Sequence, residues 1–274
     1  MKRFIKAALL CTAVLFSTNV YAQRSEMLIL AHRGGMGEGM ENTEGSFKRS
    51  LEAGIKAYEM DVRITKDGKI VLQHDHTLKR TSGVNRAVED MTEKELREVT
   101  LTDGSKLMFL DEFLDLMTKH EGLYIEFEMK TKKYSDELLY GSGYLDKVAK
   151  AVLKAEPKGS TYCMTSFDTR ALRYIKEKYP TAKLTYLTSE ACDEKSLAIA
   201  EALGVKRIAC RLEKTSYNGM KLAHKKGFIV NLWPGKNVES VVRAWALGAD
   251  IHCTDFPIAV SEFAKKNSEW LKTK

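Results

Sequence analysis

Polar side chains that could do chemistry follow or interrupt three short apolar runs. These residues are His32 and Arg33 after MLILA, Glu59 and Asp61 in AYEMDV, and Glu126, Glu128 and Lys130 in LYIEFEMK. Successive residues of a strand point to opposite faces, so the charged residues of each of the last two runs share one face. An unpaired buried charge costs several kcal/mol, so these faces predict a functional site.

The residue types indicate metal-assisted phosphoryl chemistry. Glu59, Asp61 and Glu128 supply hard carboxylate oxygens, which suit one divalent cation, Ca²⁺ or Mg²⁺, better than zinc. Arg33 and Lys130 suit a phosphate group. We interpret Glu126, on the same strand face, as a hydrogen-bonded neighbour of the site and not as a ligand.

A hairpin is expected to bring a histidine to these carboxylates. Asp67 and Gly68 lie between two β-rich arms, a strong signal for a two-residue turn. If Lys66 and Lys69 form the first pair, His74 lies directly opposite Asp61. His32 and His74 are then the candidate acid–base pair, since imidazoles titrate near neutral pH. The sequence leaves open which is the acid.

Two further histidines are given other interpretations. His76 shares the strand face of His74 but is expected to be a loop residue. His252, in the last strand, could face either the barrel interior or the helices, and a core role is favoured.

The positioning elements alternate between strand and helix. Eight apolar, β-rich runs are expected to be strands, at 27–32, 57–62, 123–129, 161–166, 184–187, 207–211, 228–233 and 250–254. Helical segments with caps such as Asn42, Asp168 and Thr92 separate them. Eight parallel strands with intervening helices predict an α/β fold, a (β/α)8 TIM barrel whose active site lies at the C-terminal strand ends. The hairpin and a short helical excursion lie between strands two and three.

The first 22 residues have the pattern of a signal peptide: a basic start, an apolar run from Ala7 to Phe16, and the small-residue site Val20-Tyr21-Ala22. The run is too short for a stable membrane anchor. A weaker alternative is lipidation of Cys11. We therefore expect an exported protein, periplasmic or secreted, with a single catalytic domain over residues 23–274.

Charge and cysteine content limit the partners. Removal of the three basic residues of the leader would lower the formal net charge from +7 to +4, too mild to argue for nucleic acid. An exported protein could pair its remaining cysteines, Cys163, Cys192, Cys210 and Cys253. Buried free thiols are favoured because none has a C-x-x-C partner. The oligomeric state remains open.

The chain resembles the glycerophosphodiester phosphodiesterases. The resemblance rests on AHRG at 31–34, ENT at 41–43, AYEMDVRITKDGKIVLQHDHTLKRTSG at 57–83, EMK at 128–130, SF at 166–167, Trp233 and TDFP at 254–257, in that order. It implies a barrel enzyme that hydrolyses small-molecule glycerophosphodiesters to an alcohol and glycerol 3-phosphate with a divalent cation. By motif position, it makes His32 and His74 the acid–base pair, Glu59, Asp61 and Glu128 the metal ligands, and Arg33 the phosphate ligand, with Glu41 and Lys130 in support.

The sequence departs from the family pattern in two places. Met40 stands where a proline commonly precedes ENT, and Trp233 is followed by Pro234-Gly235-Lys236. The second departure bears on headgroup preference, because that loop lines the mouth; Trp233 itself could be core or a substrate wall. Two alternatives stay open, a phospholipase-type barrel acting on lysophospholipids or phosphoinositol esters and a non-catalytic phosphodiester-binding barrel.

Overall fold

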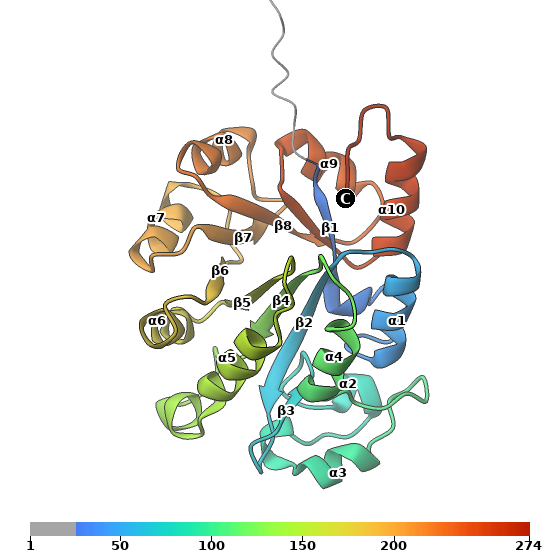
Figure 1. The fold of residues 1–274 in the computed structure, drawn as a ribbon, viewed down its shortest axis with the longest axis vertical. Helices are drawn as coiled ribbons and strands as arrows, with labels where there is room; N and C mark the ends of the chain where they lie inside the picture. The colour runs from blue at the N-terminus through green and yellow to red at the C-terminus, as the bar shows by residue number, and fades with distance from the viewer. Residues whose placement is uncertain (1–25) are drawn as a thin grey trace, which may run out of the picture.

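The structure, a computed structural model, describes residues 26–274 and is a closed (β/α)8 barrel (Figure 1). The eight parallel strands are β1 (Leu28–Ala31), β2 (Ala57–Ile64), β4 (Tyr124–Met129), β5 (Thr161–Ser166), β6 (Lys183–Leu187), β7 (Arg207–Arg211), β8 (Ile229–Gly235) and β9 (Ile251–Thr254). Strand β1 pairs with both β9 and β2, which closes the sheet. The predicted fold class is therefore confirmed. The expected leader, 1–22, lies outside the described residues.

Helices cover the outside of the barrel. They are α1 (Glu44–Glu52), α4 (Leu110–Met117), α5 (Tyr144–Ala155), α6 (Thr169–Lys178), α7 (Glu194–Ala202), α8 (Tyr217–Lys225), α9 (Ser240–Leu247) and α10 (Pro257–Lys266). Asp168 caps α6 as predicted. Helix α1, however, is capped by Thr43 and not by Asn42. Asn42 adopts a positive φ of 57° and uses its amide at the site instead.

The hydrophobic core lies between the sheet and the helices. In β4, Ile125, Phe127 and Met129 face this layer and are fully buried or nearly so. Phe127 packs against Phe113 of α4 and Tyr162 of β5, with ring centroids 5.9 and 5.5 Å apart. Because these alternate residues face outward, Glu126 and Glu128 must point into the barrel, as period-two alternation predicts.

The excursion after β2 forms a small lobe beside the barrel, seen at the lower edge of Figure 1. It contains β3 (Ile70–Leu72), α2 (Lys79–Ser82), a 3-10 turn (Val88–Asp90) and α3 (Glu93–Glu98). Thr92 and Glu95 form the expected capping box at α3. Val71, Leu96 and Phe109 belong to the lobe's own apolar cluster, which anchors the segment that carries His74.

The predicted hairpin register was wrong by one residue. Strand β2 pairs with β3 through Val62↔Leu72 and Ile64↔Ile70, so Asp61 lies opposite Gln73 and not His74. The turn contains three residues and not two: the Thr65 amide donates to the Lys69 carbonyl, and Gly68 takes the left-handed conformation at φ 81°. A shift of one residue exchanges the faces of a strand. His74 nevertheless reaches the site, because β3 ends at Leu72 and the chain turns beyond it.

The structure supports the favoured interpretations of the cysteines and of His252. Cys163, Cys192, Cys210 and Cys253 are buried free thiols. His252 is fully buried, with Nδ1 3.1 Å from the Leu232 carbonyl oxygen and Nε2 3.0 Å from Ser240 Oγ. It therefore belongs to the helix-facing layer. No helix within residues 26–274 is long and apolar enough to cross a membrane.

Candidate active site

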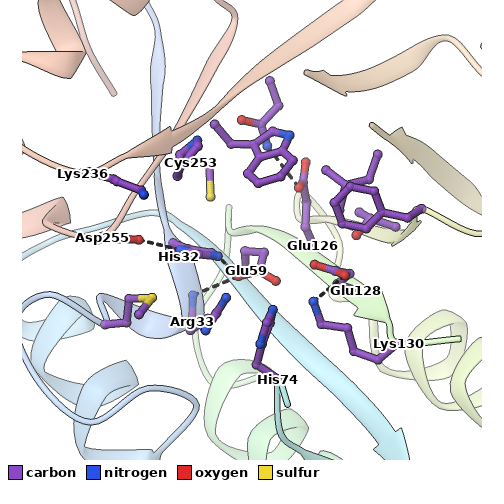
Figure 2. Close-up of a pocket in the computed structure, with 17 residues that line it drawn as sticks. His32, Arg33, Glu59, His74, Glu126, Glu128, Lys130, Lys236, Cys253 and Asp255 are labelled. Atoms are coloured by element: carbon purple, nitrogen blue, oxygen red, sulfur yellow. Dashed lines mark hydrogen bonds and ion pairs between the residues drawn. The ribbon is translucent and has the colours of Figure 1, made fainter. Parts of the chain in front are cut away.

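A cavity of about 280 Å³ opens at the C-terminal ends of the strands (Figure 2). Seven of the predicted site residues line it: His32, Arg33, Glu59, His74, Glu128, Lys130 and Trp233. Asp61 lies beneath the cavity and is fully buried, while Glu41 lies behind Arg33. The strand ends and the hairpin thus bring the predicted set together.

Three carboxylates form a cluster at the centre of this site. One oxygen each from Glu59, Asp61 and Glu128 can be chosen so that all lie within 4.8 Å of one another. Lys130 Nζ lies 2.9 Å from Asp61 and 2.5 Å from Glu128, and partly offsets their charge. Glu59 Oε1 is buried with no hydrogen-bond partner among residues 26–274. Oxygen donors around an unsatisfied buried atom fit a hard divalent cation.

Burial and neighbouring charges separate the pKa values of these carboxyls. Burial raises the pKa of Glu59 well above its usual range, and repulsion from Asp61 and Glu128 raises it further. Burial also opposes ionisation of Asp61, but attraction to Lys130 and Arg33 outweighs it and lowers that pKa. A bound cation would favour the ionised form of every carboxyl in the cluster.

A carboxylate contacts Nδ1 of each candidate histidine. His32 Nδ1 lies 2.5 Å from Asp255 Oδ1, and His74 Nδ1 lies 2.7 Å from Asp75 Oδ1. Figure 2 shows both imidazoles directed at the space beside Glu59, and His32 Nε2 lies 3.9 Å from Glu59 Oε2. A carboxylate at Nδ1 fixes the ring and leaves Nε2 for proton transfer.

Burial lowers the pKa of His74 below the ordinary 6.5, and the positive charges of Lys130 and Arg33 add to this effect. Asp61 and Asp75 act in the opposite direction but do not restore it. Arg63 fixes the backbone that carries His74, because its guanidinium donates two hydrogen bonds, of 2.8 and 3.2 Å, to the His74 carbonyl. Arg63 in turn pairs with Glu89 at 2.9 Å.

Arg33, which faces the cavity, is fixed by a chain of ion pairs. Arg33 donates to Glu41 at 3.0 Å, and Glu41 accepts two hydrogen bonds from Arg80 at 2.7 Å. Arg80 also donates to Asp75 at 2.7 Å, and so connects Arg33, through Glu41, to the carboxylate that contacts His74. Glu41 is therefore a supporting residue that holds Arg33 and does not face the cavity.

Sequence reasoning missed several members of this site. Asn42 donates to Asp61 at 2.8 Å, Arg80 bridges two carboxylates, and Asp255 holds His32. Asp255 follows the eighth parallel strand directly, so the strand-end argument applied to His32 would have found it. Sequence reasoning does not find Arg80, because it joins a near partner, Asp75, to Glu41, which lies 39 residues away along the chain.

Strands β4 and β8 contribute hydrogen-bonding and apolar groups to the wall of the cavity. Glu126 accepts from the Tyr124 hydroxyl at 2.6 Å and from Asn231 Nδ2 at 3.2 Å, and burial raises its pKa to about 7. Glu126 is therefore a hydrogen-bonded neighbour, as expected. Trp233 lines the cavity and packs edge-on against Phe167 with ring centroids 5.6 Å apart, which favours the substrate-wall interpretation.

The fold and the site define a (β/α)8 barrel with a cluster of carboxylates at its mouth. Two histidines, each in contact with a carboxylate, and two basic side chains suited to bind phosphate lie beside this cluster. The chain belongs to the glycerophosphoryl diester phosphodiesterase family, whose model matches residues 32–259, and is accordingly an enzyme. The resemblance found in the sequence is thereby confirmed.

Individual proteins similar to this chain include sequence relatives and a structure with the same fold. The chain is 26% identical over 246 residues to an uncharacterised Bacillus subtilis protein, YqiK, covering 86% of this chain and 98% of that protein. It is 32% identical over 167 residues to the glycerophosphodiester phosphodiesterase of Caldanaerobacter subterraneus, covering 58% and 66%. A solved Oleispira antarctica phosphodiesterase, in complex with the product sn-glycerol-3-phosphate, aligns with a TM-score of 0.79 at 20% identity, covering 87% and 96%.

Proposed function

We propose that this enzyme hydrolyses glycerophosphodiesters to an alcohol and glycerol 3-phosphate, using one divalent cation and the His32–His74 pair. The observation that carries the proposal is the carboxylate cluster with its two histidines, each bound to a carboxylate through Nδ1. The family membership and the product-bound relative support this class of substrate. An ion pair alone would not need an unpartnered buried oxygen such as Glu59 Oε1.

Glu59, Asp61 and Glu128 are the residues that would hold the cation. When bound, a Ca²⁺ or Mg²⁺ ion would supply positive charge that stabilises the extra negative charge developing on the phosphoryl oxygens. Arg33 and Lys130 add two protein cations at the same place and bind the phosphate. Lys130 contributes both to the cation site and to phosphate binding, because it contacts Asp61 and Glu128 and also faces the cavity.

Two proton transfers accompany the exchange of one P–O bond for another. The oxygen that attacks phosphorus, from water or from a neighbouring substrate hydroxyl, must lose a proton, and the departing alkoxide must gain one. We assign His32 as the base and His74 as the acid. This assignment rests on placement: His74 also lines a second cavity beyond the site, where the departing alcohol would lie, and His32 lines only the main one.

A panel of water-soluble glycerophosphodiesters tests the proposed function. The enzyme should release glycerol 3-phosphate from glycerophosphocholine, glycerophosphoethanolamine and glycerophosphoglycerol. An enzyme that needs an acyl chain would ignore all three and cleave only lysophospholipids. A binding barrel would retain the substrates without product release.

We further propose export, which the leader pattern of residues 1–22 supports. The mature protein would begin at Gln23. N-terminal sequencing of protein recovered outside the cytoplasm tests this; retention of Met1, or a lipid on Cys11, would overturn it.

A further inference from the structure

A second cavity, of about 360 Å³, adjoins the active site on the side of the excursion. The two cavities share His74, Glu128, Lys130 and Phe167 in their linings. The junction of the two cavities therefore carries a candidate acid–base residue, His74, and a basic residue suited to bind phosphate, Lys130. A phosphodiester has two ester arms that leave phosphorus in different directions, so phosphorus at this junction would direct one arm into each cavity.

The two cavities differ in chemistry, which distinguishes the arms. The main cavity carries His32 and the hydrogen-bonding pair Glu126 and Asn231, groups that suit the hydroxyls of glycerol. The second cavity lacks these residues and is lined by basic side chains. It therefore suits the other arm, the alcohol that departs.

The second cavity has an excess of positive charge. Leaving the histidines aside, its lining contains Arg63, Lys130, Lys132 and Lys133 against Asp75 and Glu128, which is four cations and two anions. Within the cavity or just behind it, most of these charges are already paired.

The paired groups are Arg63 with Glu89 at 2.9 Å, Lys130 with Glu128 at 2.5 Å, and Asp75 with Arg80 at 2.7 Å. Lys132 and Lys133 are exposed and pair with no carboxylate among residues 26–274. Two ammonium groups remain available at the wall of a cavity that opens onto the reacting atoms.

Building on the function proposed above, we propose that this cavity binds the departing alcohol and that Lys132 and Lys133 select alcohols that carry an additional phosphate group. Lysine binds phosphate as a point charge, so two unpaired lysines can together contact a phosphodiester, which carries one negative charge, or a phosphomonoester, which carries nearly two. A cationic alcohol such as choline would meet the same charges as repulsion.

The test compares three substrates that differ in the charge of the alcohol. The alcohol that departs is anionic for bis(glycerophospho)glycerol, neutral for glycerophosphoglycerol and cationic for glycerophosphocholine. The wild-type kcat/KM should fall in that order, and the ratio of the first to the last should shrink as salt rises, because exposed charges are screened. Lys132→Ser/Lys133→Ser should lower this ratio about three- to tenfold, as expected for two exposed charge interactions. The rate on the neutral substrate should stay nearly unchanged.

Two control variants separate a local from a general charge effect. Lys132→Arg/Lys133→Arg keeps the charge and should keep the preference. Lys265→Ser/Lys266→Ser removes the same charge from the end of α10, at the opposite end of the barrel, and should not change it. The proposal is overturned if the wild type shows no preference, if the serine variant keeps the wild-type ratio, or if the α10 variant changes it equally. In those cases the wild type still hydrolyses glycerophosphoglycerol, and only the alcohol preference is refuted. A wild-type enzyme that hydrolyses none of the three substrates would instead refute the proposed function itself.

Discussion

Asp255→Asn is expected to slow hydrolysis without disturbing the fold. The Asp255 carboxylate lies 2.5 Å from His32 Nδ1, and its side chain is 16% exposed, so solvent screens this contact little. The remaining contacts of Asp255 at the site are made by its backbone, to Gly37 and Gly235, and survive the substitution. The variant therefore tests the contact of the Asp255 carboxylate with His32 and leaves these backbone contacts in place.

The expected loss follows from the type of hydrogen bond. A hydrogen bond to a charged group contributes about 1.5–3 kcal/mol, and an asparagine amide can also turn its NH2 toward Nδ1 and favour the wrong tautomer. Loss of that amount in the transition state lowers kcat/KM by roughly 10- to 150-fold, at about 1.4 kcal/mol for each factor of ten.

The assay is steady-state release of glycerol 3-phosphate from glycerophosphoglycerol, with the melting temperature measured in parallel. A matched control is Asp250→Asn, which alters another histidine–carboxylate pair, 3.1 Å from His224, outside the active site. That variant should keep its activity. An Asp255→Asn enzyme within twofold of wild type would refute the role given to Asp255.

Three other variants test separate parts of the account. Glu128→Gln should reduce kcat about a thousandfold or more with the fold intact, because it removes one proposed ligand of the cation. An unchanged kcat would exclude Glu128 as a ligand of the cation. His74→Ala should lower the rate of hydrolysis of alkyl glycerophosphodiesters about 10²–10⁴-fold, but far less with a p-nitrophenol leaving group, which departs without protonation. His32→Ala should be slow on both substrates. An equal loss of rate on both substrates for His74→Ala would exclude the acid role. Burial lowers the pKa of His252 to about 4, so between that pH and pH 6.5 the unfolded chain binds a proton that the folded chain does not. The free energy of unfolding should therefore fall by about 2 kcal/mol more between pH 7.5 and pH 5 in wild type than in His252→Gln. Equal dependence of urea denaturation on pH in the two proteins would contradict this.

Much of the barrel could be predicted because strand position and side-chain alternation are local properties. All eight parallel strands lie within two residues of their predicted bounds, and the inward face of β4 follows from alternation alone. Once the strand ends are known, parallel pairing brings them to one mouth. Glu59, Asp61 and Glu128 therefore meet without further information.

The errors arise where a tertiary contact or a turn decides the outcome. Gly68 in the left-handed conformation adds one residue to the hairpin turn and shifts the register by one, although Asp67-Gly68 also permits the shorter turn. Asn42 is a good helix cap by type, but its side chain contacts both the carboxylate and the backbone amide of Asp61, which leaves Thr43 to cap α1. Neither choice is visible in local sequence.

The central claim is that Glu59, Asp61 and Glu128 hold one divalent cation that hydrolysis requires. The most direct test is to strip the enzyme with a chelator, titrate Ca²⁺ or Mg²⁺ back by calorimetry, and measure hydrolysis of glycerophosphoglycerol at each point. The account predicts one bound ion per chain, recovery of activity in proportion to occupancy, and no binding to Glu128→Gln. A fully stripped enzyme that hydrolyses at the wild-type rate would contradict it.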